Sequence, residues 1–196
     1  MCAVYHRDMP KLIIGLVGRQ GSGKGTAADL LKTKYGAQVF RFSAVLSDIL
    51  NRLSIEKSRD NLIALSEALR KAFSEDVLSY AVERDALASS SDVVVIDGIR
   101  RIEDIAAFEP LPNFRLIEIA VPAKVRFDRM RGRGEKVGED HMSWDDFVAQ
   151  EDAPTEVTIA DVAARAWKAL DNSGSPADLE RSLDQTMAEL GLKPRA

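Results

Sequence analysis

The stretch KLIIGLVGRQGSGKGT, residues 11–26, decides how this chain folds. It opens with an apolar run over residues 11–17, and glycines follow directly. A continuous apolar run that stops at glycines is typical of a strand buried on both faces of a parallel sheet. Helical spacing of Ala27, Leu30 and Leu31 predicts a helix over residues 26–35, which Gly36 ends. The glycine-rich stretch therefore lies between a buried strand and a helix.

The stretch GRQGSGKGT, residues 18–26, has the composition of a phosphate-binding loop. Its glycines let several backbone N–H groups turn toward phosphate oxygens, and the following helix adds the positive end of its dipole. Lys24 can reach the β- and γ-phosphates of a nucleotide, and the hydroxyl of Thr26 can face Mg²⁺. We therefore expect ATP and Mg²⁺ as cofactors. The residues expected at the nucleotide are Gly18, Gln20, Gly21, Ser22, Gly23, Lys24, Gly25 and Thr26.

Strands and helices alternate along the rest of the chain, which predicts an α/β protein with a parallel sheet. Further strands are expected at residues 39–42, 93–96, 115–121 and 166–170. Helices are expected at 43–53, where Ser43 would be the cap, and at 61–73, 77–87, 102–108, 123–131, 143–150, 158–165 and 176–190. Residues 1–10 carry no period and are expected to form a tail, so that one domain spans residues 11–196.

The composition fits an ordinary globular protein and excludes several classes. The chain has 196 residues, of which 45% are hydrophobic and 30% charged, and its net charge is −4. That charge does not predict a nucleic-acid partner. One cysteine and two histidines exclude a disulfide framework and a cysteine- or histidine-based zinc site. The apolar run at residues 12–17 is too short to span a bilayer, so no membrane partner and a cytoplasmic location are expected.

Asp97 ends the apolar run VVVI at residues 93–96. A carboxylate at the carboxyl end of a strand beside a phosphate loop can hold Mg²⁺ or position an acceptor hydroxyl. The alternative is a simple turn, because Asp-Gly is also common turn chemistry. With the phosphate loop present we favour the functional interpretation, in which Thr26 and Asp97 organise the metal.

Arginines concentrate in two places. Arg100 and Arg101 follow Asp97, and four more lie within residues 126–133. Guanidinium groups match the equatorial oxygens of a transferring phosphoryl group, so this second cluster predicts a lid over phosphates, with glycines at 132, 134 and 138 for mobility. A solvated basic helix face is the alternative. The catalytic candidates are Lys24, Asp97, Arg100, Arg129 and Arg133.

Several stretches resemble P-loop kinases of the nucleoside-monophosphate-kinase superfamily. They are GRQGSGKGT at 18–26, RFSAVLSDIL at 41–50, VVVIDGIRRIEDIAAF at 93–108, RFDRMRGRGE at 126–135 and DNSGSPADLERSL at 171–183. Within this superfamily, the chain is similar to a dephospho-CoA-kinase-like and adenylate-kinase-like group of archaea and bacteria. It is also similar to phage deoxynucleoside monophosphate kinase.

The resemblance implies a three-layer fold with a five-stranded parallel sheet flanked by helices. It also implies a helical acceptor region at about residues 43–90 and an arginine-rich lid at about 126–150. Arg100 and some of the lid arginines would neutralise the transferring group. Residues implied at the acceptor are Ser43, Arg59, Arg70 and Arg100, and those implied near the donor are Arg129, Asn172, Ser173 and Gly174.

The sequence thus favours an ATP- and Mg²⁺-dependent kinase, a monomer or homodimer, that phosphorylates a small acceptor. A (deoxy)nucleoside monophosphate is the first choice and dephospho-CoA the second. A regulatory ATPase switch is the main competitor. A Ras-type GTPase is disfavoured because no asparagine is followed by lysine, and a polynucleotide acceptor is disfavoured by the net charge of −4.

Overall fold

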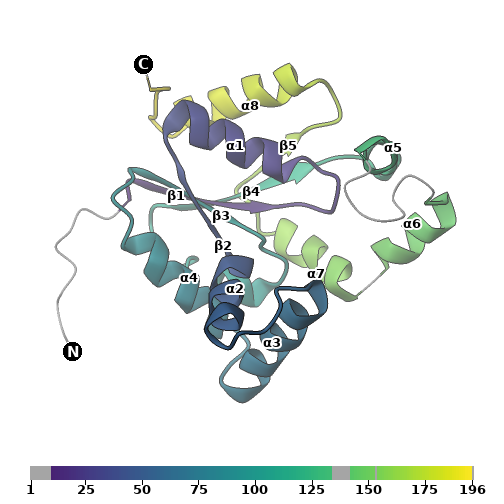
Figure 1. Ribbon diagram of the computed structural model, residues 1–196. Helices are drawn as coiled ribbons and strands as arrows, with labels where there is room; N and C mark the ends of the chain where they lie inside the picture. The colour runs from purple at the N-terminus through teal and green to yellow at the C-terminus, as the bar shows by residue number, and fades with distance from the viewer. Residues whose placement is uncertain (1–9, 134–141, 153, 196) are drawn as a thin grey trace.

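The computed structural model describes residues 10–133, 142–152 and 154–195 (Figure 1). Most of the expected N-terminal tail and the middle of the expected lid therefore lie outside the described residues. Five parallel strands form one sheet in the order β2-β3-β1-β4-β5. They are β1 (Leu12–Val17), β2 (Gln38–Arg41), β3 (Val93–Asp97), β4 (Phe114–Ala120) and β5 (Lys168–Asp171). The predicted α/β fold with a five-stranded parallel sheet is confirmed.

The central strand β1 is buried along its whole length, as its apolar run predicts. It pairs with β3 on one side and β4 on the other, and in that register Gly15 lies opposite Ile96 and Leu116. A Cβ on Gly15 would lie 2.9 Å from side-chain carbon atoms of Ile99 and Phe114, so a larger residue here would force these side chains to shift. The phosphate loop leaves the sheet directly after this strand.

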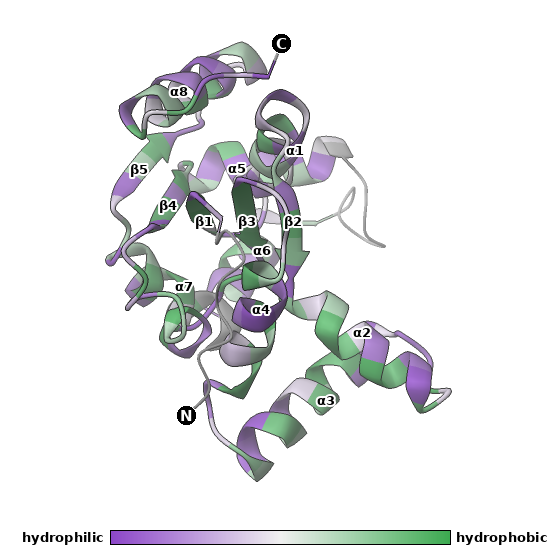
Figure 2. Ribbon diagram, turned by 90° about the vertical axis from the view of Figure 1, so that its left-hand side faces the viewer, coloured by the Kyte–Doolittle hydropathy of each residue, from purple (hydrophilic) through white to green (hydrophobic). Residues whose placement is uncertain are grey.

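Helices cover both faces of the sheet (Figures 1 and 2). One face packs on α1 (Lys24–Tyr35) and α8 (Pro176–Glu189). The other packs on α2 (Phe42–Arg52), α4 (Val77–Leu87), the short 3₁₀ helix η1 (Ile102–Ile105) and α7 (Pro154–Ala163). Apolar side chains from the sheet and the helices form one core cluster on each face. The three-layer arrangement is therefore as predicted.

The remaining helices lie at the edges. Helix α3 (Arg59–Ala72) packs beside α2, and this pair projects from the lower end of the molecule in Figure 2. Helices α5 (Ala123–Arg133) and α6 (Trp144–Glu151) follow β4 on the side of the phosphate loop. A separate apolar cluster of Phe127, Met130 and Phe147 joins α5 to α6.

Three local predictions need correction. Ser43 does not cap α2, because Arg41 remains extended in β2 and is itself the N-cap. The helix expected at residues 102–108 is a 3₁₀ helix of only four residues followed by turns. Helix α7 begins at Pro154 rather than at residue 158, and proline is favoured at a first helical position. Ser175 and Asp178 form a capping box at the start of α8.

Candidate active site around the phosphate loop

The phosphate loop has the backbone conformation that its glycines allow. Gly18, Gly21 and Gly23 have φ values of 152°, 78° and 93°, in the left-handed region that L side chains rarely adopt. Gly23 caps α1, and a Cβ there would lie 2.3 Å from Nδ2 of Asn172. The loop therefore curls tightly between β1 and the positive end of α1, which suits an anion.

Lys24 is the first residue of α1 and its side chain folds back over the loop. Its Nζ donates to the carbonyl oxygen of Gly18 and, at 3.2 Å, to that of Arg19. Thr26 lies in the same first helical turn and is exposed. Apart from its chain neighbours and its own helix backbone, no described residue lies within 4 Å of a Cβ built on Gly25, so the space beside this turn is open. An ammonium group and a hydroxyl thus share the mouth of the loop.

A cavity of about 590 Å³ runs from the loop to the carboxyl ends of β2 and β3. Its lining unites most of the predicted nucleotide residues with part of the predicted acceptor set. The lining residues are Gly18, Gln20, Gly21, Ser22, Gly23, Lys24, Gly25, Thr26, Asp29, Arg41, Ser43, Asp97, Gly98, Ile99, Arg100 and Ile159. Ser43, Asp97 and Arg100 therefore line the same cavity as Lys24 and Thr26.

Asp97 has a partner that the sequence does not predict. Its Oδ2 accepts a hydrogen bond from Nε of Arg41 at 3.0 Å. Arg41 and Asp97 are register partners at the ends of β2 and β3, so the pair is built by strand pairing. The Asp97 side chain is 16% exposed, whereas that of Arg41 is 50% exposed. An arginine thus stands at the cavity beside the carboxylate.

The donor set suits Mg²⁺ held largely by phosphate and water. Within the described residues no group of three or more His, Cys, Asp or Glu side chains converges on one point. Thr26 and Asp97 offer one hydroxyl and one carboxylate at the cavity. Mg²⁺ keeps several waters and takes one or two protein oxygens beside substrate phosphates, so these two residues fit it.

A sequence profile described as an AAA domain matches residues 17–148 of this chain. The chain belongs to this family. Its relatives include the UPF0200 protein TK1334 of Thermococcus kodakarensis, 28% identical over 184 residues that cover 91% of this chain and 98% of the relative. Another is a UPF0200 protein of Hyperthermus butylicus, 24% identical over 92% of this chain and 95% of the relative.

Solved structures with the same fold include P-loop kinases. TT1252 from Thermus thermophilus superposes with a TM-score of 0.64 at 24% identity and covers 93% of this chain and 99% of its own. A shikimate kinase from Aquifex aeolicus superposes with a TM-score of 0.53 at 14% identity, covering 92% and 98%. This AAA-domain chain therefore has the P-loop kinase fold. Among its described residues, no helix combines the length and the apolar character needed to cross a bilayer.

The loop after β5 supports the phosphate loop. Asn172 is 6% exposed, and its Nδ2 donates to the carbonyl oxygen of Ser22 at 2.8 Å. Its backbone N–H donates to the carbonyl oxygen of Ala120 at 2.9 Å. Arg129 donates from Nη2 to the carbonyl oxygen of Gly174 at 3.1 Å. The structure therefore brings Arg129, Asn172 and Gly174 together at one side of the loop.

Arg126, on the same helix as Arg129, is buried. It donates to both carboxylate oxygens of Glu151, at 2.7 Å to Oε1, and Nη1 of Arg19 donates to Oε2 at 2.7 Å. Burial of Glu151 opposes its ionisation, but the hydrogen bonds from Arg126 and Arg19 outweigh it and hold the pKa of this carboxyl below 4.5. Arg126 is thus engaged with protein. The predicted role of the Arg133 side chain lies outside what the structure describes.

Two of the predicted acceptor residues do not line the cavity. Arg59 is the first residue of α3 and is exposed. Arg70 is 6% exposed, and its Nη2 donates to Oδ1 of buried Asp104 at 2.5 Å. Asp104 also accepts from the backbone N–H of Arg100 at 2.8 Å and of Arg101 at 3.0 Å. Arg70 therefore supports the loop that carries Arg100 and does not itself line the cavity.

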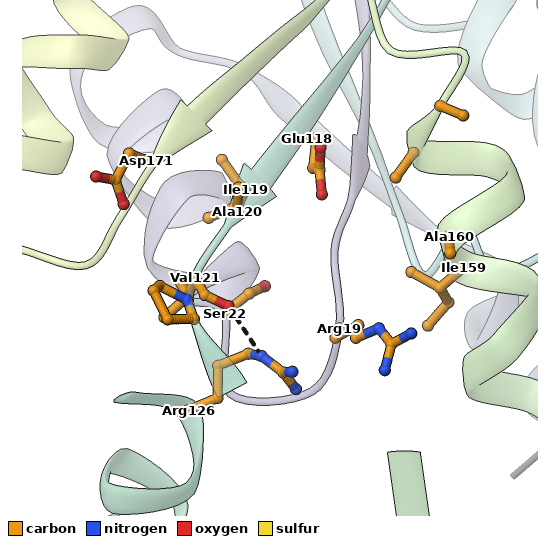
Figure 3. Close-up of a pocket in the computed structure, with 13 residues that line it drawn as sticks. Arg19, Ser22, Glu118, Ile119, Ala120, Val121, Arg126, Ile159, Ala160 and Asp171 are labelled. Carbon is orange, nitrogen blue, oxygen red and sulfur yellow. Dashed lines mark hydrogen bonds between the residues drawn. The ribbon is translucent and has the colours of Figure 1, made fainter. Parts of the chain in front are cut away.

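A second cavity, of about 650 Å³, lies on the other side of the phosphate loop (Figure 3). Arg19, Ser22 and Arg126 bound it, together with the ends of β4 and β5 and the alanines of α7. Glu118 of β4 points into this space in Figure 3. The sequence does not predict this cavity, although Glu118 interrupts the apolar run RLIEIAV with a charged residue.

Proposed function

We propose that this chain is an ATP- and Mg²⁺-dependent phosphotransferase with a small acceptor, first of all a (deoxy)nucleoside monophosphate. The observation that carries the proposal is the single cavity shared by the phosphate loop, Asp97 and Arg100. A transferase must hold donor phosphates and acceptor within reach of each other. A regulatory ATPase needs only the donor side, so the acceptor-side residues favour the kinase.

The charged and polar residues of the cavity would have different roles in the transfer. Lys24 at the head of α1 would stabilise the negative charge of the donor phosphates, and the backbone N–H groups of the loop would orient them. Thr26 and Asp97 would hold Mg²⁺, which when bound neutralises the charge that develops on the phosphates. Arg100, and Arg41 beside Asp97, would face the acceptor end of the same cavity. Positioning and charge neutralisation supply most of the catalysis in such enzymes.

Whether Asp97 is needed as a general base depends on the chemical group of the acceptor. In the transfer, the bond between the γ-phosphorus and its bridging oxygen breaks, and a new bond forms to the acceptor oxygen. An acceptor phosphate is already ionised and has no proton to lose, so no base is needed. A ribose hydroxyl, as in dephospho-CoA, must release its proton, and Asp97, which lines the cavity, would take it.

The test is ADP release from ATP and Mg²⁺ in the presence of nucleoside monophosphates, deoxynucleoside monophosphates or dephospho-CoA, each assayed separately. One acceptor should accelerate turnover, and Lys24→Ala should lower kcat/KM by about 10²–10³-fold. Lys32→Ala is the matched control, because Lys32 is exposed on the same helix. Turnover that no acceptor accelerates would support the ATPase switch instead.

A second comparison identifies the acceptor chemistry. Asp97→Asn should impair transfer to a hydroxyl more severely than transfer to a phosphate, because only the hydroxyl needs a base. Equal losses with both kinds of acceptor would remove Asp97 from the role of base.

A further inference from the structure

Three separate parts of the chain meet at Glu151, the last residue of α6. Its Oε2 accepts from Nη1 of Arg19 in the phosphate loop at 2.7 Å, and both its oxygens accept from Arg126 of α5. The Arg126 side chain is 5% exposed and that of Glu151 is 13% exposed. The Arg19 side chain is 33% exposed, so one carboxylate joins a buried and a partly exposed guanidinium group. The buried charges of Arg126 and Glu151 depend on each other most.

The same contacts hold the outer side of the phosphate loop. Arg126 also donates to the carbonyl oxygens of Val121 at 3.1 Å and Gln20 at 3.4 Å. A Cβ on Gly21 would lie 3.1 Å from the carbonyl oxygen of Arg126, so α5 packs directly against the loop backbone. Arg19 and Arg126 thus restrain the loop on the side away from the cavity of Lys24 and Thr26.

Helix α6 has its own attachment to α5, independent of Glu151. Trp144 stacks on Phe147 with ring centroids 5.4 Å apart, and both rings meet Phe127 edge-on at 5.3 and 5.5 Å. These aromatic contacts join α6 to α5 and do not involve Glu151, while the Arg126 guanidinium also lies 5.4 Å from the centroid of the Phe147 ring. Glu151 therefore lies on a helix that side chains other than its own attach to α5.

We propose that Glu151 is a positioning residue that holds the phosphate loop in its nucleotide-binding shape through Arg19 and Arg126. The proposal rests on the proposed function in one respect only, that this loop binds the donor nucleotide. Loss of the carboxylate would free Arg19 and leave the buried guanidinium of Arg126 without its anion. Part of the binding free energy of the donor nucleotide would then be used to order the loop, and the affinity for the donor would fall.

The experiment measures the Kd of a non-hydrolysable ATP analogue with Mg²⁺ by calorimetry in the full-length protein. Glu151→Gln, which keeps the shape and removes the charge, should raise this Kd about tenfold or more. Asp145→Asn is the matched control, because Asp145 is exposed on the same helix and its loss changes the net charge equally. It should change the Kd less than twofold. Arg19→Lys, which keeps a cation for Oε2, should retain most of the affinity.

Fluorescence of Trp144 separates positioning from simple destabilisation. Trp167→Phe leaves Trp144 as the one tryptophan of the chain. In that background, Glu151→Gln should leave the emission of Trp144 unchanged while the Kd rises. A lower melting temperature with an unchanged Kd would overturn the proposal in favour of a purely structural role, and so would emission typical of an exposed indole. A lower Kd would overturn it too, because Glu151 would then be holding the arginines away from phosphate.

The outcomes also separate this proposal from the proposed function. If the wild-type protein binds the analogue but transfers phosphate to no acceptor, the kinase assignment fails and the role of Glu151 is still decided by the Kd values. If the wild-type protein does not bind the analogue, both fail.

Discussion

Replacement of Asp104 by alanine should be among the most damaging single changes in this protein. Its carboxylate is 4% exposed and accepts from the Arg70 guanidinium and from the backbone N–H groups of Arg100 and Arg101. Asp104→Ala removes all three bonds at once. The side chain of Arg70 is 6% exposed, so its charge would be left in the interior without an anion.

The cost follows from that unpaired charge. Removal of one partner from a buried ion pair destabilises a protein by about 3–5 kcal/mol. Arg70 keeps a hydrogen bond to the carbonyl oxygen of Glu75, which places the expected loss at the lower end, about 3–4 kcal/mol. In a domain of this size, each kcal/mol lowers the melting temperature by about 2–4 °C, so the expected fall is about 6–16 °C.

Urea unfolding followed by circular dichroism measures this free energy, with Arg70→Met as the comparison. Arg70→Met should cost less, about 1–3 kcal/mol, because Asp104 keeps its two backbone donors. The double variant should be no less stable than Asp104→Ala alone, since it no longer buries a lone guanidinium. A loss below about 1 kcal/mol for Asp104→Ala, or a double variant as unstable as the sum of the two, would refute the reasoning.

Three further predictions concern the loop and two titrating groups. Gly23→Ala should abolish binding of the ATP analogue in calorimetry, because φ is 93° and the new Cβ would lie 2.3 Å from Nδ2 of Asn172; retained affinity would show that the loop can rearrange. Because the pKa of Glu151 is held below 4.5, its stabilising effect is complete above that pH and is lost as the pH falls through the lowered value. The stability difference between wild type and Glu151→Gln should therefore shrink in acid, and a constant difference would contradict this. Burial and the hydrogen bond to Asp184 raise the pKa of Tyr35 to about 12, so its contribution is complete below pH 10 and lost toward pH 12. Unfolding measured at pH 9 and pH 12 should show the gap between wild type and Tyr35→Phe closing, whereas a gap that widens would argue against the raised value.

The strands and the phosphate loop were predictable because their signals are local. An apolar run, a change of period and a cluster of glycines lie within a few residues of one another, as in residues 11–26. The ends of the elements were less predictable. Arg41 stays in β2 because Asp97 is its partner in the next strand, and that long-range pairing moves the start of α2 away from the expected cap at Ser43.

The same limit explains what was missed around the candidate site. Arg70 stands at the polar end of an apolar helix, where a ligand contact and an internal ion pair look alike in sequence. Its partner Asp104 is 34 residues away. Glu151 lies 132 residues from Arg19, so no local sequence pattern predicts that the two residues form an ion pair. Patterns within one element predict which chemistry is present, whereas the contacts that fix its geometry join elements that only the fold brings together.

Parallel pairing explains why the site nevertheless gathers at one edge. All five strands run in the same direction, so their carboxyl ends meet there and each following segment contributes. The segments after β1, β2 and β3 supply the cavity with the phosphate loop, Ser43 and Arg100. Those after β4 and β5 supply Arg126 and Asn172, which hold the loop from outside. The phosphate loop and the residues that support it therefore follow different strands. Under the proposed function, changes on the β4 and β5 side should alter donor affinity, whereas changes on the β2 and β3 side should alter the choice of acceptor.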